Sequence, residues 1–224
     1  MFSDRVDAGR QLAQRVSHLR GDDVVVLGLP RGGVPVAHQV AQALNAPLDV
    51  IVVRKLGSPF KPELAMGAIG EDGVRVLNQR VLAQVGATES DVRSAERRET
   101  PLLQQRLTQL RSGRKRLELD GRTAVVVDDG IATGSTARAA CTVARRLGAT
   151  RVVLAVPVAP AGTARRVPEA DEVICVATPA HFKAVSCYYR DFSPTGDDEV
   201  ADLLHTADRQ TRVSPASPEE GKVR

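Results

Sequence analysis

Aromatic residues are scarce in this chain of 224 residues, which has four phenylalanines, two tyrosines and no tryptophan. Proteins that hold single-stranded nucleic acid stack its bases on aromatic side chains, so the scarcity argues against that class. Cysteines are scarce too, and no two of them have the spacing of metal ligands; they are Cys141, Cys175 and Cys187. We therefore expect reduced thiols, which are typical of a cytoplasmic protein.

Long apolar segments are also missing from the sequence. No run approaches the roughly 20 residues that cross a bilayer, and the charged residues 1–5 are not typical of a signal peptide. Hydrophobic residues make up 42% of the chain and charged residues 26%, as in ordinary globular proteins. The length suffices for one α/β domain with a sizeable core. These features predict a cytoplasmic protein without a membrane partner.

Positive charge is unevenly distributed along the chain. The net charge is only +4, yet residues 93–122 contain nine lysines and arginines against four acids. Such a run is usually the solvated face of a helix, although it can also hold an anionic ligand or nucleic acid. No aromatic residue interleaves with these charges. We therefore favour the solvated helix and do not expect a nucleic-acid partner.

Short β-branched runs alternate with stretches of helical period. The run at residues 24–27 is wholly apolar, as in strands that are buried on both faces of a parallel sheet. Strands are predicted at residues 24–27, 48–53, 123–127, 151–156 and 172–176, and helices at 4–20, 33–44, 88–113, 135–147 and shortly after 160. The alternation predicts an α/β fold, in which a mostly parallel, twisted sheet carries helices on both faces.

Three segments fall outside this alternation. Residues 57–80 are rich in glycine, proline and charge, and are expected to form a long excursion with a hairpin near residues 71–73. Residues 191–200 are expected to be irregular, and residues 206–224 to be a disordered tail. Within the longest predicted helix, Pro101 either causes a kink or begins a second helix.

Residues 124–136 carry most of the predicted chemistry. Four apolar residues precede Asp128 and Asp129, and three small or apolar residues then precede Thr133, Gly134, Ser135 and Thr136 at the start of a helix. Free N–H groups at a helix start bind phosphate, whereas paired carboxylates suit hydroxyl donors or Mg²⁺. A turn and a helix cap explain each part alone. Their combination at a strand's carboxyl end predicts a site for a ribose 5-phosphate and a metal.

This segment resembles the motif with which type I phosphoribosyltransferases bind 5-phosphoribosyl-1-pyrophosphate (PRPP). The resemblance implies a Rossmann-like, Mg²⁺-dependent enzyme that transfers the phosphoribosyl group of PRPP to a nucleobase or related heterocycle and releases pyrophosphate. It implies that Asp128 and Asp129 are catalytic and bind the ribose hydroxyls, directly or through Mg²⁺ and water. The loop residues that would also hold PRPP are Gly130, Ile131, Ala132, Thr133, Gly134, Ser135 and Thr136.

The resemblance also implies how the chain is divided. A single phosphoribosyltransferase-like domain would cover residues 1–190, with residues 56–122 as a loop and helical insertion and residues 177–200 as a small hood. The insertion takes the place of the family's flexible loop, which closes over the reacting centre and excludes water. A homodimer is expected as well.

Two further positions suit a pyrophosphate. Adjacent glycines, Gly32 and Gly33, expose backbone amides, and Arg31 offers a forked donor for phosphate oxygens. Family members bind pyrophosphate at this loop, where we expect a cis peptide between Arg31 and Gly32. Arg54 and Lys55 follow the second predicted strand and are also candidates for binding pyrophosphate, although solvent-exposed charge explains them equally well.

Four of the six aromatic residues cluster within eleven positions near the end of the last predicted strand. By resemblance to the family's hood, Phe182, Lys183 and Val185 are the candidate contacts for the base. An aromatic ring stacks on a heterocycle, and a lysine donates to an exocyclic oxygen. The alternative is that the rings fill a small core or a dimer contact, which we favour for Tyr188 and Phe192.

The motif departs from part of the family at Ala132. Hypoxanthine-type members have there an aspartate that handles the proton of the base, whereas adenine-type members have alanine. Glu71 in the excursion is the candidate general base. The alternative function is a non-catalytic regulator that binds PRPP or a nucleotide on the same fold. An unrelated phosphatase or kinase-like enzyme would need a nucleophile or a Walker lysine at a strand end, and the sequence has none in such a context.

Overall fold

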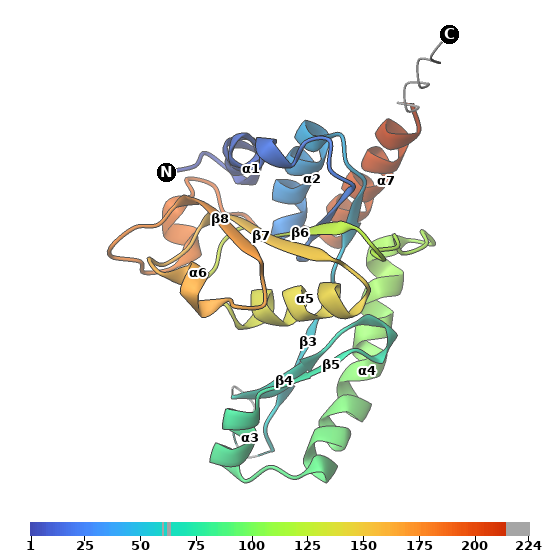
Figure 1. Cartoon of the computed structure of the whole chain (residues 1–224), viewed down its shortest axis with the longest axis vertical. Helices are drawn as coiled ribbons and strands as arrows, with labels where there is room; N and C mark the ends of the chain where they lie inside the picture. The colour runs from blue at the N-terminus through green and yellow to red at the C-terminus, as the bar shows by residue number, and fades with distance from the viewer. Residues whose placement is uncertain (60, 62–63, 214–224) are drawn as a thin grey trace, which may run out of the picture.

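A five-stranded parallel sheet forms the core of the computed structural model, which describes residues 1–59, 61 and 64–213 (Figure 1). The strand order is β2-β1-β6-β7-β8. The strands are β1 (Val24–Gly28), β2 (Leu48–Val50), β6 (Thr123–Val127), β7 (Arg151–Val158) and β8 (Glu172–Ala177). Each neighbouring pair is parallel. The predicted fold class is therefore confirmed.

Helices cover both faces of this sheet. They are α1 (Arg5–Arg15), α2 (Gly33–Leu44) and α7 (Asp197–Val213) on one face and α5 (Ser135–Arg146) on the other (Figure 1). Successive side chains of a strand point to opposite faces. In β1, Val24 and Val26 pack with α1, α2 and α7, whereas Val25 and Leu27 pack with α5. This alternation explains why the whole strand is apolar.

The excursion after β2 forms a second, antiparallel sheet. Its strands, in the order β3-β4-β5, are β3 (Arg54–Gly57), β4 (Ala65–Ile69) and β5 (Arg75–Leu77). Glu71–Gly73 lies between β4 and β5, which confirms the predicted hairpin. With α3 (Gln79–Val85) and α4 (Glu89–Arg111), this sheet makes a second lobe that extends away from the core (Figure 1). The sequence predicts neither β3 nor α3, because both are short and only partly buried.

Helix α4 is one continuous helix. Thr88 caps its start, because the Thr88 hydroxyl accepts from the Asp91 N–H while the Asp91 carboxylate accepts from the Thr88 N–H. Pro101 lies inside the helix at an exposed position, and the hydrogen bond that its missing N–H would make is lost without ending the helix. A second helix beginning at Pro101 is therefore not formed.

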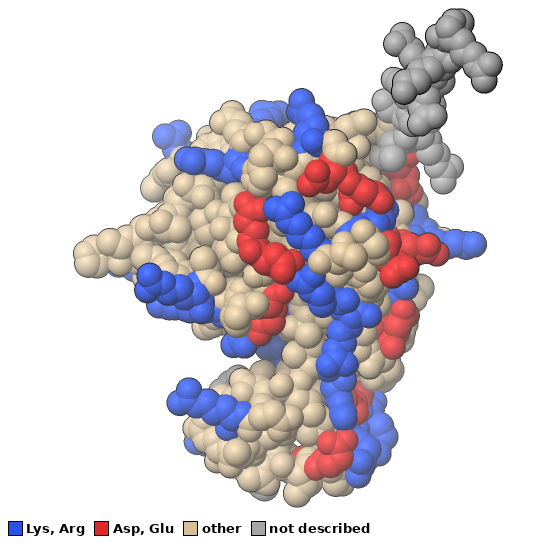
Figure 2. Space-filling model, viewed as in Figure 1, with Lys and Arg blue, Asp and Glu red and all other residues tan. Residues whose placement is uncertain are grey.

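Ion pairs within the chain take up most of the basic run at residues 93–122. Acidic residues are interspersed with the basic ones on the face shown in Figure 2. The pairs are Arg106–Asp197, Arg111–Asp49, Arg111–Glu71, Arg114–Asp208, Arg116–Asp72 and Arg122–Asp23. They join the end of the second lobe and the segment after it to the core sheet and to α7. The basic run thus has a structural use.

Helix α7 corrects two predictions. Residues 191–200 are not wholly irregular and residues 206–213 are not a disordered tail, because a helix spans Asp197–Val213. The rest of the predicted tail, residues 214–224, lies outside the described residues. Val200 and Leu204 are fully buried against the core. Three acids at its start and apolar residues at helical spacing were available signals for this helix.

Smaller differences concern the ends of elements. The first helix stops at Arg15 and is followed by a 3-10 turn at Ser17–Leu19, whereas the sequence predicts one helix to residue 20. The predicted short helix after residue 160 is α6 (Thr163–Arg166). In the part of the chain that the structure describes, no helix combines the length and apolarity needed to cross a membrane.

Candidate substrate site

The acid pair, Asp128 and Asp129, directly follows β6 at the carboxyl edge of the parallel sheet. The Asp129 N–H donates to Asp128 Oδ1 at 2.9 Å, and Arg5 Nε donates to Asp129 Oδ2 at 2.9 Å. The Tyr189 hydroxyl donates to the Asp129 carbonyl at 2.5 Å. No other described residue donates a hydrogen bond to Asp128 Oδ2 or to Asp129 Oδ1, although the two carboxyl groups interact with each other through their side chains. Each carboxylate therefore has one oxygen that no residue outside the pair occupies.

Burial raises the pKa of both carboxyl groups above that of an ordinary aspartate. For Asp128, desolvation is the largest cause, and the adjacent Asp129 charge adds to it. For Asp129, desolvation again raises the pKa, while the hydrogen bond and charge of Arg5 lower it. Two like charges in a desolvated place repel each other. A hydroxyl donor or a cation at the free oxygens relieves that repulsion.

The turn between β1 and α2 lies directly against the acid pair. A Cβ atom on Gly32 would lie 2.0 Å from Asp129 Oδ2, and one on Gly33 would lie 2.6 Å from the Val127 carbonyl oxygen. Real Cβ atoms do not approach so closely, so only glycine allows this contact at either position. The structure therefore brings the predicted glycines and the predicted carboxylates together.

The same turn contains Arg31. The peptide bond between Pro30 and Arg31 is cis, one bond earlier than the predicted bond between Arg31 and Gly32. The Arg31 side chain is half exposed, and its Nη1 lies 3.9 Å from Asp197 Oδ1 at the start of α7. Such a long and exposed ion pair leaves the guanidinium available to an anion beside the turn.

The loop between the acid pair and α5 presents unused backbone N–H groups. Gly134 has a φ of 80°, a left-handed conformation that glycine adopts readily, and α5 begins at the next residue. No described residue accepts from the N–H groups of residues 133–136. The hydroxyls of Thr133 and Ser135 lie 3.3 Å apart beside them. Free amides at the start of a twelve-residue helix suit a phosphate.

The predicted hood, residues 177–200, packs against this loop through Val185. A Cβ atom on Gly130 would lie 2.6 Å from Val185 Cγ1, so the two segments are in direct contact. The ring of Phe182 stacks on Tyr188 with centroids 5.6 Å apart, and Lys183 is exposed next to it. Of the three predicted base contacts, Val185 therefore lies against the loop that follows the acid pair, and Phe182 and Lys183 lie just before it in the chain.

Other hood aromatics pack with the N-terminal segment. Phe2 and Phe192 contact Tyr189, with ring centroids at 5.3 Å and 5.0 Å. Backbone hydrogen bonds join the same segments, since the Phe2 N–H donates to the Tyr188 carbonyl at 2.8 Å. These rings form a small core of their own. The packing alternative thus holds for Tyr188, Tyr189 and Phe192, and the candidate base contacts Phe182 and Val185 pack against the same small core.

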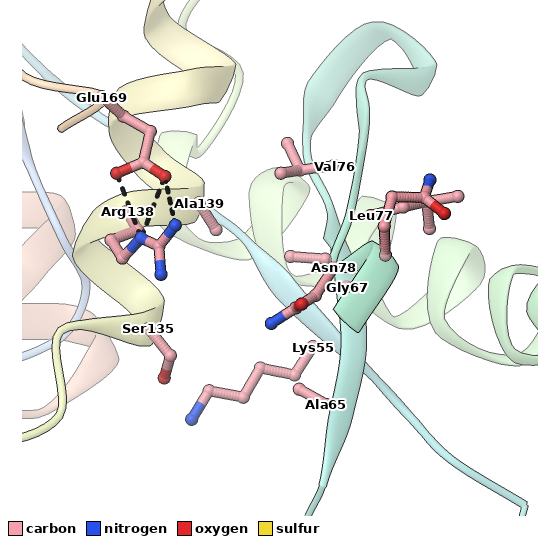
Figure 3. Close-up of a pocket in the computed structure, with 12 residues that line it drawn as sticks. Lys55, Ala65, Gly67, Val76, Leu77, Asn78, Ser135, Arg138, Ala139 and Glu169 are labelled. Atoms are coloured by element: carbon pink, nitrogen blue, oxygen red, sulfur yellow. Dashed lines mark hydrogen bonds and ion pairs between the residues drawn. The ribbon is translucent and has the colours of Figure 1, made fainter. Parts of the chain in front are cut away.

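The two cations after β2 point to different places. Arg54 on β3 donates to Glu99 of α4, with Nη2 at 2.6 Å from Oε2. Lys55 lines a cavity of about 230 Å³ between the second lobe and α5. Its side chain points from β3 toward Ser135, at the start of α5 (Figure 3). The structure therefore separates Lys55 from Arg54 and directs it to the loop before α5.

Both walls of this cavity carry polar groups that the sequence does not single out. Asn78 extends from the second lobe, and Arg138 and Glu169 lie opposite it (Figure 3). Arg138 Nη2 donates to Glu169 Oε1 at 2.6 Å. The apolar lining comes from Ala68, Val76, Leu77 and Ala139. The cavity thus combines apolar walls with a few donors beside the phosphate loop, as binding pockets commonly do.

Glu71 does not lie free at the acid pair. Arg111 Nη1 donates to Glu71 Oε2 at 2.6 Å, and Arg111 Nη2 donates to Oε1 at 3.0 Å. Both side chains are buried. Desolvation raises the pKa of Glu71, and Arg111 opposes that rise. A general base needs a free oxygen at the substrate. Both oxygens of Glu71 are bound to Arg111 in this structure, so Glu71 has a structural partner, and its catalytic role stays a prediction.

Arg5 and Tyr189 belong to the site, yet the sequence does not indicate them. Arg5 binds Asp129 across 124 positions of the chain, and Tyr189 binds it across 60. No motif surrounds either residue. Only their apolar neighbours hint that the two ends of the domain are anchored to each other.

The fold and this site define a phosphoribosyl transferase domain. The family model described as "Phosphoribosyl transferase domain" matches residues 4–191, and the chain belongs to that family. The resemblance to the phosphoribosyltransferases is thereby confirmed.

The chain is similar over most of its length to two proteins, one of which has a known crystal structure. A Mycobacterium tuberculosis protein, Rv0571c, is provisionally named a phosphoribosyl transferase and is 60% identical over 210 residues. The match covers 93% of this chain and 47% of the relative, so the chain spans about half the length of that protein. The crystal structure of TT1426 from Thermus thermophilus is 42% identical, with a TM-score of 0.83. That match covers 91% of this chain and 97% of the Thermus chain.

Proposed function

We propose that the chain is a Mg²⁺-dependent phosphoribosyltransferase that transfers the 5-phosphoribosyl group of PRPP to a nucleobase or related heterocycle and releases pyrophosphate. The observation that carries the proposal is that a pair of carboxylates and a set of free backbone N–H groups follow the same strand at the edge of the sheet. Asp128 and Asp129 each offer a free oxygen, and the next loop offers free amides at a helix start. Vicinal hydroxyls and a phosphate on one sugar match these two features.

The groups of PRPP have separate partners in this proposal. The ribose hydroxyls donate to Asp128 Oδ2 and Asp129 Oδ1, and the 5-phosphate accepts from the amides and hydroxyls of residues 133–136. The pyrophosphate lies beside the turn of Arg31, Gly32 and Gly33, where a forked donor and close backbone support it. Arg54 is not part of this set, because Glu99 holds its guanidinium.

The acid pair also fits Mg²⁺. The ion prefers oxygen ligands and commonly binds one or two carboxylates together with water and substrate phosphates. The described residues contain no group of three or more acids, histidines or cysteines that could hold a metal alone. Asp128 and Asp129 would therefore hold the ion, directly or through water, with PRPP completing its shell. When bound, Mg²⁺ neutralises charge on the departing pyrophosphate.

In this proposal, the residues of the chain contribute mainly by orienting PRPP and the acceptor. In the transfer, the bond from the anomeric carbon to pyrophosphate breaks, and a bond from that carbon to the acceptor forms. The acid pair and the phosphate loop hold the ribose at both ends, which keeps the anomeric carbon in line with the acceptor. Arg31 and the amides of the turn stabilise the charge of the leaving pyrophosphate.

Phe182, Lys183 and Val185 are the proposed contacts for the acceptor. Val185 begins the turn Val185–Tyr188 and contacts Gly130 in the loop that follows the acid pair, and Phe182 and Lys183 directly precede that turn. The acceptor would thus lie beside the ribose. This geometry supports the hood as its binding place and leaves the identity of the acceptor to experiment. A homodimer and a cytoplasmic location remain predictions.

One observation favours a second function, a non-catalytic regulator that binds PRPP or a nucleotide. Ala132 has no acidic group, and both oxygens of Glu71 are bound to Arg111. Ala132 therefore offers no base, and Glu71 would have to act while it is paired with Arg111. A regulator needs no such base, whereas an enzyme then requires an acceptor that reacts without one.

The test is to incubate the protein with PRPP, Mg²⁺ and a panel of bases while pyrophosphate release is followed. Release that depends on one base supports the enzyme. Tight binding of PRPP in calorimetry without release supports the regulator. Failure to bind PRPP with Mg²⁺ overturns both functions.

Replacing Gly32 with alanine is expected to weaken PRPP binding at least about tenfold. The new Cβ would lie 2.0 Å from Asp129 Oδ2, so the carboxylate or the turn must move. Calorimetry with PRPP and Mg²⁺ measures the change. Gly196→Ala is the matched control, since a Cβ there meets nothing within 4 Å. Equal affinities of the two variants would contradict the close contact.

Replacing Lys55 with methionine is expected to weaken binding of inorganic phosphate and of PRPP by a similar factor, about threefold to tenfold. Lys55 extends across the cavity to the start of α5, so it would contribute to the phosphate end of the ligand alone (Figure 3). Lys115→Met, at an exposed position after α4, is the control. Unchanged phosphate affinity in Lys55→Met would remove Lys55 from the site.

A further inference from the structure

Arg5 is fixed by three different contacts. Its Nε donates to Asp129 Oδ2 at 2.9 Å, and its Nη1 donates to the Ser193 carbonyl at 2.7 Å. Its guanidinium carbon lies 4.0 Å from the centre of the Phe192 ring. A planar guanidinium that stacks on an aromatic ring and donates two hydrogen bonds has little freedom to rotate. The N-terminal helix and the hood thus hold one arginine rigidly on the acid pair.

This contact is largely shielded from water. The Arg5 side chain is 12% exposed and that of Asp129 is 15% exposed. The backbone of Gly32 packs closely against the ion pair of Arg5 and Asp129, since a Cβ atom on Gly32 would also lie 3.0 Å from Arg5 Nε. In such a place, charge is weakly screened and strongly affects what binds next to it. Two carboxylates and one guanidinium leave a single net negative charge at the site.

We infer that Arg5 is a positioning residue that adapts the acid pair to a sugar diol on an anionic ligand and makes it a poor site for a free divalent cation. The inference rests on the proposed function. Arg5 uses Asp129 Oδ2 and thereby leaves Oδ1 without a donor from Arg5, so that Oδ1 and Asp128 Oδ2 are the oxygens that would accept from a ligand. By removing one negative charge, it also lessens repulsion of the phosphates that PRPP carries on either side of its ribose.

The inference predicts opposite changes in two affinities when the charge is removed. In Arg5→Gln, Mg²⁺ alone is expected to bind about tenfold more tightly, because a second negative charge faces it. Ribose 5-phosphate is expected to bind at least about tenfold more weakly, because Asp129 is no longer fixed. Inorganic phosphate, which would bind at the loop before α5 and Lys55 and not at the acid pair, is expected to change less than about twofold. Titration calorimetry measures all three ligands.

Two variants separate charge from geometry and from stability. Arg5→Lys keeps the charge but cannot make all three contacts, so its Mg²⁺ affinity should match the wild type while its ribose 5-phosphate affinity is intermediate. Arg10→Gln, at an exposed position of the same helix, is the matched control and should change nothing. Thermal unfolding of each variant shows whether the fold persists.

The outcomes distinguish this inference from the proposed function. Opposite shifts for Mg²⁺ and ribose 5-phosphate in Arg5→Gln support it. Unchanged affinities, or a parallel loss of all three together with a lower Tm, overturn it and give Arg5 a merely structural role. If the wild type itself fails to bind ribose 5-phosphate and PRPP, the proposed function fails instead.

Discussion

Replacing both members of the acid pair, Asp128→Asn together with Asp129→Asn, is expected to reduce PRPP affinity at least about 100-fold. A hydrogen bond to a charged group contributes about 1.5–3 kcal/mol, and each carboxylate is proposed to accept one from the ribose. The pair is also the proposed Mg²⁺ site, so the loss includes the metal. Calorimetry with PRPP, with and without Mg²⁺, measures the change.

The same substitution is expected to leave the fold intact. Desolvation and mutual repulsion raise the pKa of both carboxyls, so charge at this place does not stabilise the folded state. Asn at 128 should leave the Tm unchanged or raise it. Asp202→Asn, on the exposed side of α7, is the matched control for a lost surface charge. Wild-type affinity for PRPP in the double variant would refute the central proposal.

The site was predictable wherever neighbours in sequence form it. Asp128, Asp129 and the loop to Thr136 lie in one continuous segment between a strand and a helix, and local geometry places them at the sheet edge. The approach of Gly32 to Asp129 follows from the parallel pairing of β1 and β6, which any α/β fold with these strands adjacent would produce. Sequence pattern therefore sufficed to place residues 128–136 at the sheet edge, while their roles in binding stay predictions.

Contacts between distant segments explain what the sequence could not predict. Arg5 reaches Asp129 only because the N-terminal segment pairs with the hood, and no periodicity records that contact. Of the second sheet, only the hairpin near residues 71–73 is predicted, because its strands are short and pair antiparallel within a segment rich in turn residues. The charge of Glu71 suggests catalysis, but its burial with Arg111 depends on the packing of α4, which no local pattern shows.

Buried ion pairs of Arg111 hold the second lobe against the core sheet. The second lobe returns to the core through Arg111, whose guanidinium joins Asp49 of β2 to Glu71 of the hairpin. Arg111 Nη2 also donates to the Val50 carbonyl at 3.2 Å. Lys55 extends from that lobe toward the phosphate loop, so the lobe's orientation decides whether Lys55 can reach a ligand. We expect a change at Arg111 to affect both stability and phosphate binding.

Arg111→Met is expected to lower the free energy of unfolding by about 3–5 kcal/mol. The guanidinium is the shared partner of two buried carboxylates, with Nε at 3.1 Å from Asp49 Oδ1 and Nη1 at 2.6 Å from Glu71 Oε2. Without it, Glu71 keeps the desolvation that raises its pKa and loses the partner that lowers it. Chemical denaturation at neutral pH measures the loss, and Arg93→Met, which breaks an exposed pair on the same helix, should cost less than about 1 kcal/mol.

The pH dependence of this loss tests its cause. A carboxyl whose folded pKa lies above its unfolded pKa stabilises the fold below the unfolded value and destabilises it as the pH rises through the folded value. The difference between Arg111→Met and the wild type should therefore shrink as the pH falls toward 4.5, the ordinary pKa of a glutamate. Adding Glu71→Gln to Arg111→Met should likewise recover part of the stability at neutral pH, because one unpaired buried charge is removed. A loss that is independent of pH and unaffected by Glu71→Gln would show that Arg111 acts through packing of its stem and not through its charge.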